Sequence, residues 1–106
     1  MESIKDKDLE TVFGQKEYTV MLFSSAMDVN SVLAENALDS LMDAYKDCCT
    51  FCKSDVSEDV GLAKRYSILS VPRILVFRGG SLLEEVTGLM SHAVLKGFLD
   101  RTVIHR

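Results

Sequence analysis

Two short apolar runs, at residues 18–23 and 73–77, restrict the folds that this chain can adopt. Neither run alternates polar with apolar residues, so each is typical of a strand covered on both faces of a sheet. The chain between them predicts three further elements: a helix at 32–45, a strand at 50–56 and a helix capped by Ser57 that runs to residue 66. Strands that alternate with helices favour parallel pairing, so we expect an α/β fold with helices on both faces of a mixed sheet.

The rest of the chain completes this order. Gly79-Gly80 predicts a hairpin whose return strand, at 81–87, pairs antiparallel with the preceding strand. Three elements lie nearer the ends: a weakly marked strand at 1–4, a helix at 7–15 capped by Asp6, and a last helix at 91–104. We therefore expect a central sheet of four or five strands in a single domain over residues 1–106.

Charge and hydropathy exclude several kinds of partner. The 106 residues carry a net charge of −4 without a cluster of lysine and arginine, which argues against nucleic acid. No apolar run approaches the roughly 18 residues that span a bilayer, which argues against the membrane. The N-terminal segment is too charged for a signal peptide, so we expect a cytoplasmic protein.

Three stretches of the sequence resemble the thioredoxin family. They are "YTVMLFSSAMD", "KSDVSEDVGLAKRYSILSVPRILVFRGG" and "VTGLMSHAVLKGFLD", and together they cover nearly the whole chain. The resemblance implies a thioredoxin-like fold. It also implies that Pro72, the one proline of the chain, stands at the position of the family's cis-proline.

The resemblance fails at the residues that carry thioredoxin chemistry. Thioredoxins have Cys-x-x-Cys where this chain has Asp28-Val29-Asn30-Ser31, so neither Asp28 nor Ser31 supplies a thiol. Met27 stands at the position of the family's tryptophan, and Leu22 at that of its buried aspartate. The resemblance thus implies a former redox loop without catalytic residues, in which Asp28 and Ser31 serve as helix caps.

The departures from the family pattern also affect two charged residues, Lys53 and Arg73. In the family a lysine at the position of Lys53 approaches the buried aspartate, which is Leu22 here, so we expect Lys53 to be solvated or paired elsewhere. Arg73 follows Pro72 and is expected near the 27–31 loop, where it could form an ion pair with Asp28.

The three cysteines offer a different Cys-x-x-Cys, at Cys49 and Cys52, on a predicted strand. Side chains alternate along a strand, so these two thiols are expected on opposite faces, with Cα atoms about 10 Å apart. Cys48, at the entrance to the strand, is the candidate reactive thiol. The two histidines lie elsewhere in the chain and complete no tetrahedral ligand set, so we expect no metal and no cofactor.

The expected function follows from the loops that the fold brings together. The residues expected to form a binding surface are Met27, Val29, Ser70, Val71, Pro72, Arg73, Leu89 and Met90. Grouped apolar residues on loops indicate a contact site, although they could instead pack on one another. The leading hypothesis is a redox-inactive module that binds a protein or an extended peptide, with Val71 offering backbone for strand addition. The alternatives are a thiol oxidoreductase or redox sensor acting through the cysteines, and a structural subunit of an oligomer.

Overall fold

The computed structural model describes residues 1–88 and 90–103. Within these residues, one mixed sheet has the strand order β1-β3-β2-β4-β5. The strands are β1 (Glu2–Ser3), β2 (Tyr18–Ser24), β3 (Cys49–Asp55), β4 (Arg73–Arg78) and β5 (Ser81–Thr87). The expected α/β fold with a mixed central sheet of four or five strands is confirmed.

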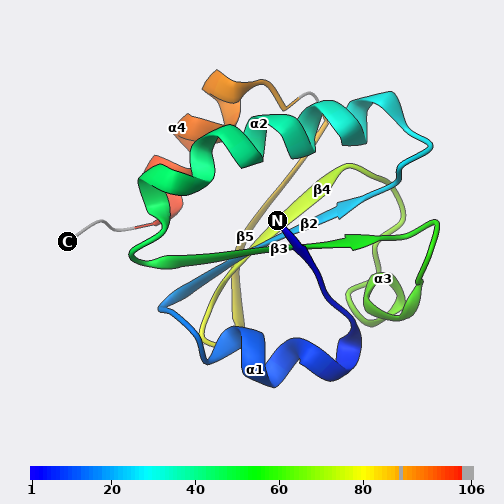
Figure 1. Ribbon diagram of the computed structural model, residues 1–106, viewed down its shortest axis with the longest axis horizontal. Helices are drawn as coiled ribbons and strands as arrows, with labels where there is room; N and C mark the ends of the chain where they lie inside the picture. Colours follow the sequence, from blue (N-terminus) through cyan, green and yellow to red (C-terminus); the bar gives the residue numbers. More distant parts are fainter. Residues whose placement is uncertain (89, 104–106) are drawn as a thin grey trace.

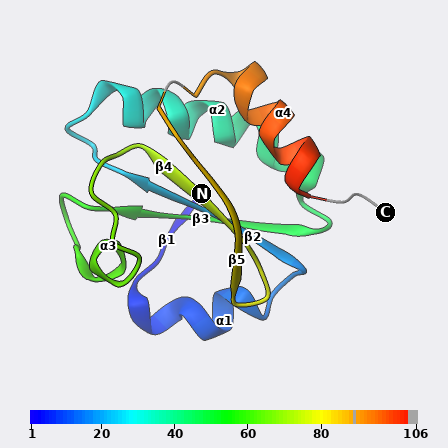
Figure 2. The same cartoon turned by 180° about the vertical axis from the view of Figure 1, so that it is seen from behind.

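Helices cover both faces of this sheet. They are the 3₁₀ helix η1 (Asp6–Asp8), α1 (Leu9–Phe13), α2 (Val29–Tyr45), α3 (Gly61–Arg65) and α4 (His92–Thr102). Figure 1 shows α2 and α4 on one side of the sheet and α1 and α3 on the other, and Figure 2 shows the same layers from behind. The arrangement follows from the crossover rule, because a parallel strand pair needs a helix to connect its ends.

Hydrogen-bond register fixes which residues share an edge of the sheet. β2 pairs in parallel with β3, with Leu22 opposite Lys53, and antiparallel with β4, with Phe23 opposite Arg73. All seven residues of β2 are buried, as the unbroken apolar run predicts for a central strand. Gly79, at φ +59°, makes the tight hairpin between β4 and β5, a conformation that favours glycine.

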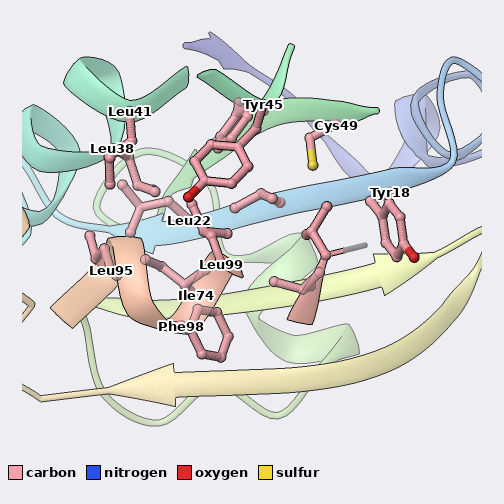
Figure 3. Close-up of a cluster of buried hydrophobic side chains, with 14 of the residues drawn as sticks. Tyr18, Leu22, Leu38, Leu41, Tyr45, Cys49, Ile74, Leu95, Phe98 and Leu99 are labelled. Carbon is pink, nitrogen blue, oxygen red and sulfur yellow. The ribbon is translucent and has the colours of Figure 1, made fainter. Parts of the chain in front are cut away.

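The core has two parts, one on each face of the sheet. The first lies under α2 and α4, and Figure 3 shows ten of its side chains labelled, among them Tyr45, Cys49 and Leu99. The second lies under α1 and α3 and includes Phe23, Cys52 and Phe77. Alternate residues of β2 and β3 point into the two clusters, so each strand contributes to both.

Helix α2 begins earlier than expected and buries a different face. It starts at Val29 rather than at residue 32, with Asp28 as its N-cap. Leu33, one of the apolar residues that suggested the helix, is 56% exposed. The buried residues instead are Ser31, Ala34, Leu38, Leu41 and Tyr45, which follow one another at intervals of three and four.

Two predicted helix starts were wrong. Ser57 does not cap α3, because its N–H and hydroxyl both donate to Asp55 Oδ1 in a turn, and the helix begins only at Gly61. At the other end of the chain, the N-cap of η1 is Lys5 and not Asp6. The last helix follows Ser91 as expected and runs over His92–Thr102, and residue 104, its predicted end, lies outside the described residues.

Candidate functional site

Two segments lie beyond the end of β2 and the start of β4, residues 27–31 and residues 69–73, and together we call them the loop face. They are neighbours because Phe23, near the end of β2, pairs with Arg73 at the start of β4. The peptide bond between Val71 and Pro72 is cis. The register therefore places the segment that leads into α2 and the segment around Pro72 at the same end of the sheet.

Asp28 serves as a helix cap. Its Oδ2 atom accepts hydrogen bonds from the Ser31 backbone N–H at 2.8 Å and from the Ser31 hydroxyl at 2.9 Å. Ser31 is buried, so both donors would be unpaired without the carboxylate. The expected capping role is confirmed for Asp28, whereas Ser31 is not a cap but lies in the first turn of α2 and donates to Asp28.

The expected ion pair between Asp28 and Arg73 was wrong. Arg73 instead donates to Glu85 of β5 at 2.7 Å. The register explains this choice, because Glu85 pairs with Leu75 on the neighbouring strand and lies on the same face as Arg73 two residues away. Asp28 is left to its bonds with Ser31.

Apolar side chains on the loop face reach solvent. Met27 is 87% exposed and Val29 74% exposed. Leu69, which the sequence analysis did not select, is 94% exposed. The sequence could have indicated this exposure, because Leu69 lies in the loop between α3 and Pro72, outside any helix or strand whose apolar spacing would bury it.

Other predicted binding residues are divided by burial. Ser70 is exposed, Val71 is half-buried, and Pro72 is buried. Met90 was expected on the surface but is 6% exposed and packs in the first cluster, so it is not available for contact. Leu89 lies outside the described residues.

A groove of about 500 Å³ runs beside the loop face, between α3 and the segment before Pro72. Its walls are mostly apolar. They are formed by Val56, Val60, Ala63, Lys64, Ser67, Ile68, Leu69, Ser70 and Val71. Val60 is half exposed, so the groove continues the apolar surface that Leu69 begins.

Charged groups behind the loop face are paired. Lys53 donates to Glu35 of α2 at 2.8 Å, which confirms that it is paired elsewhere than at position 22. The hydrogen bond from Lys53 to Glu35 raises the pKa of the lysine above its usual range. Hydrogen bonds from Ser57, opposed by partial burial, lower the pKa of Asp55, which also accepts from the Ala26 N–H.

The cysteines lie away from this surface. Cys49 belongs to the first cluster and Cys52 to the second, so the prediction that they face opposite sides of β3 is confirmed. Burial raises the pKa of each of these two thiols to about 12. Cys48 is half-buried and is the most accessible of the three, and its Sγ lies 3.7 Å from that of Cys49.

Comparison with known proteins identifies the family. Residues 15–101 match the thioredoxin family. The chain belongs to the thioredoxin family. It is 30% identical over 66 residues to an M-type chloroplastic thioredoxin of Zea mays, covering 62% of this chain and 40% of that one. It is 32% identical over 63 residues to a thioredoxin of Acidithiobacillus ferridurans, covering 59% and 58%. The chain thus spans between 40% and 58% of the length of these two relatives.

A solved structure supports the fold. A mutant thioredoxin from Halobacterium salinarum NRC-1 superimposes with a TM-score of 0.81 at 24% identity, covering 99% of this chain and 95% of that one. This thioredoxin-family chain carries Asp28 and Ser31 at the N-terminus of α2, where the resemblance places the family's two cysteines. Within the described residues, no helix is long and apolar enough to cross a membrane.

Proposed function

We propose that this thioredoxin-family chain is a redox-inactive module that binds a protein or an extended peptide through its loop face. One observation carries the proposal. The three most exposed large apolar side chains among the described residues are Leu69, shortly before Pro72, and Met27 and Val29, at the N-terminus of α2, so they come from the two segments that meet the same end of the sheet. Grouped apolar side chains that reach solvent mark contact surfaces, and methionine adapts to varied partners.

The backbone at Val71 supports an extended ligand. Strand addition needs free main-chain groups and a pocket for alternate side chains. Val71 precedes Pro72 at the margin of the apolar groove, so a peptide paired with Val71 could place one side chain in that groove. This use of the loop face requires no sulfur.

The positions and burial of the thiols also support a redox-inactive module. Disulfide exchange needs an accessible thiolate. The N-terminus of α2 has no thiol, and the pKa of Cys49 and of Cys52 is raised to about 12 by burial. Cys48 is the remaining candidate for an oxidoreductase, which makes it the residue to test.

Binding is tested with reduced, carboxymethylated α-lactalbumin, which stays unfolded and presents extended chain. We expect Met27→Ser and Leu69→Ser each to weaken its binding by roughly 5- to 10-fold in fluorescence anisotropy, the effect of losing an apolar contact of more than 1 kcal/mol. Leu82→Ser is the matched control, because Leu82 is an exposed leucine near the hairpin at the other end of the sheet. Equal losses in all three variants, or no binding by the parent, would contradict the proposal.

Redox activity is tested separately by reduction of insulin disulfides with dithiothreitol as electron donor. We expect no rate above that of dithiothreitol alone. A rate that Cys48→Ser abolishes would instead identify an oxidoreductase that acts through a relocated thiol.

A further inference from the structure

Strand β5 leaves one side of its backbone without a neighbouring strand. It ends the sheet, and within the described residues no strand pairs with its outer side. A groove of about 580 Å³ lies between β5 and the C-terminal half of α4, and Figure 3 shows the Phe98 ring, which lines this groove, beside β5. We propose that the groove binds an extended segment of another protein by strand addition, with a basic side chain opposite Glu84 and an apolar one opposite Val86.

The regular part of β5 begins at Glu84. Leu82 pairs with Phe77 and Glu84 pairs with Val76, so Leu83 is the extra residue of a β-bulge. A bulge twists an edge strand and disfavours further pairing at that point. Residues 84–87 instead pair one-to-one with β4, so they form the part of the edge that can accept another strand. Strand addition there supplies main-chain hydrogen bonds, and specificity comes from alternate side chains.

Two side chains of this stretch lie on the same side of the sheet as α4. Glu84 pairs with Val76 and Val86 with Ile74, and both partners on β4 belong to the first cluster. Val86 packs against that cluster and lines the groove together with Phe98. In an added strand, the residues opposite Glu84 and Val86 would therefore face the groove. An apolar side chain opposite Val86 would extend its apolar surface.

The carboxylate of Glu84 determines the charge that the partner needs. The neighbouring Glu85 lies on the other side of the sheet and accepts from Arg73 at 2.7 Å, so its charge is already compensated. Glu84 is exposed and has no ion-pair partner among the described residues. Opposite charges directly across a strand pair stabilise the pair, so the position opposite Glu84 favours lysine or arginine. The net charge of −4 also favours the approach of a basic segment.

A second copy of this chain is a poor partner for β5. When a twofold axis pairs a strand with its own copy, one residue lies directly opposite itself. The register that pairs the whole of Ser81–Thr87 places Glu84 opposite Glu84 of the second copy. A shift in one direction places Glu85 opposite Glu85, and a shift in the other centres the pair on the bulged Leu83. Like charges that lie opposite each other are destabilising, so β5 favours a segment of different sequence.

The test is a nuclear magnetic resonance titration of the nitrogen-labelled protein, at low salt, with the blocked peptide Thr-Lys-Thr-Val-Thr-Lys-Thr. With its valine opposite Val86, this peptide places a lysine opposite Glu84 in either strand direction. We expect saturable shifts of the amide signals of residues 84–87. Glu84→Gln should weaken binding roughly 3- to 5-fold. Glu10→Gln is the matched control, because Glu10 is an exposed glutamate on α1, on the other face of the sheet, and it should have no effect.

Arg101 of α4 also lines the groove, so it tests the sign of the charge. Arg101→Gln should not weaken binding of the lysine peptide, and a peptide with glutamate in place of both lysines should bind more weakly than the lysine peptide. Tighter binding of the glutamate peptide would overturn the basic partner. Equal losses in Glu84→Gln and Glu10→Gln, or shifts confined to the loop face, would overturn the site at β5. A dimer of the parent protein in analytical ultracentrifugation that Glu84→Gln strengthens would instead identify a second copy as the occupant.

Discussion

The two ends of helix α2 differ in the sign of the charge that they stabilise. At the N-terminus, the carboxylate of Asp28 accepts two hydrogen bonds from Ser31. At the C-terminus, the thiol of Cys48 lies against the carbonyl oxygen of Tyr45. The helix dipole stabilises an anion at the first end and opposes one at the second. A thiol at the N-terminus of a helix is therefore more acidic than one at the C-terminus. In this chain the N-terminus of α2 has no thiol.

This difference bears on what family membership implies for activity. The resemblance to thioredoxins places two cysteines at the N-terminus of α2, where the dipole favours a thiolate. This chain has three cysteines, but they follow the C-terminus of the helix or lie inside β3. The position of the sulfur atoms, rather than their number, sets their acidity.

The largest expected effect comes from the buried thiols at high pH. The pKa of Cys49 and of Cys52 is raised from 9.0 to about 12 in the folded state, mainly by burial. A group whose folded pKa is raised contributes stability that is present below its unfolded pKa and is lost as the pH rises. Between pH 8 and pH 10, each thiol should lower the free energy of unfolding by about 1 kcal/mol, measured by urea denaturation under a reducing agent.

The control for this prediction is Cys52→Ala. This variant is expected to be less stable at every pH, because it leaves a cavity in the second cluster. Its loss of stability between pH 8 and pH 10 should nevertheless be about 1 kcal/mol smaller than that of the parent. An identical loss in both proteins would mean that Cys52 ionises equally in the folded and unfolded states.

The fold could be predicted from the sequence where burial is complete. β2 and β4 were predicted from their unbroken apolar runs, which are typical of strands that are covered on both faces of a sheet. The face of α2 was harder to predict, because Leu33 and Leu38 both fit an apolar helical spacing. Only the position of the sheet and of α4 decides that Leu38 is buried and Leu33 is exposed.

The candidate site was predicted in part for a related reason. Loop residues have no period, so their exposure depends on tertiary packing that a sequence does not state. Met27 and Val29 were expected in solvent and are there, whereas Met90 fills the first cluster. The partner of Arg73 is fixed by the register of β4 and β5, which the hairpin signal alone could not supply.

A smaller effect should appear when a thiol is placed at the N-terminus of α2. Asp28→Cys puts the sulfur where the dipole lowers a thiol pKa into the range of about 3.5 to 7.5. Alkylation by iodoacetamide at pH 7 should therefore be on the order of 10-fold faster at position 28 than at Cys48, because the dipole favours the reactive thiolate at position 28 and Cys48 is half-buried. Mass spectrometry of the two peptides compares both sites in one molecule. Equal alkylation rates at the two positions would contradict the inference that the two ends of α2 differ in how well they stabilise a thiolate.

The smallest effect concerns the cap that replaces the thiol. Asp28→Ala removes the acceptor of two hydrogen bonds from Ser31, and we expect it to lower the free energy of unfolding by about 1 kcal/mol. Asp28→Asn should recover most of this loss, because the amide oxygen can still accept from the Ser31 N–H. Ser91→Ala is the matched control at the N-cap of α4, where one bond at 3.2 Å is lost, and its effect should be smaller. If Asp28→Asn were as unstable as Asp28→Ala in urea denaturation, the charge of Asp28 rather than its capping geometry would stabilise this end of α2.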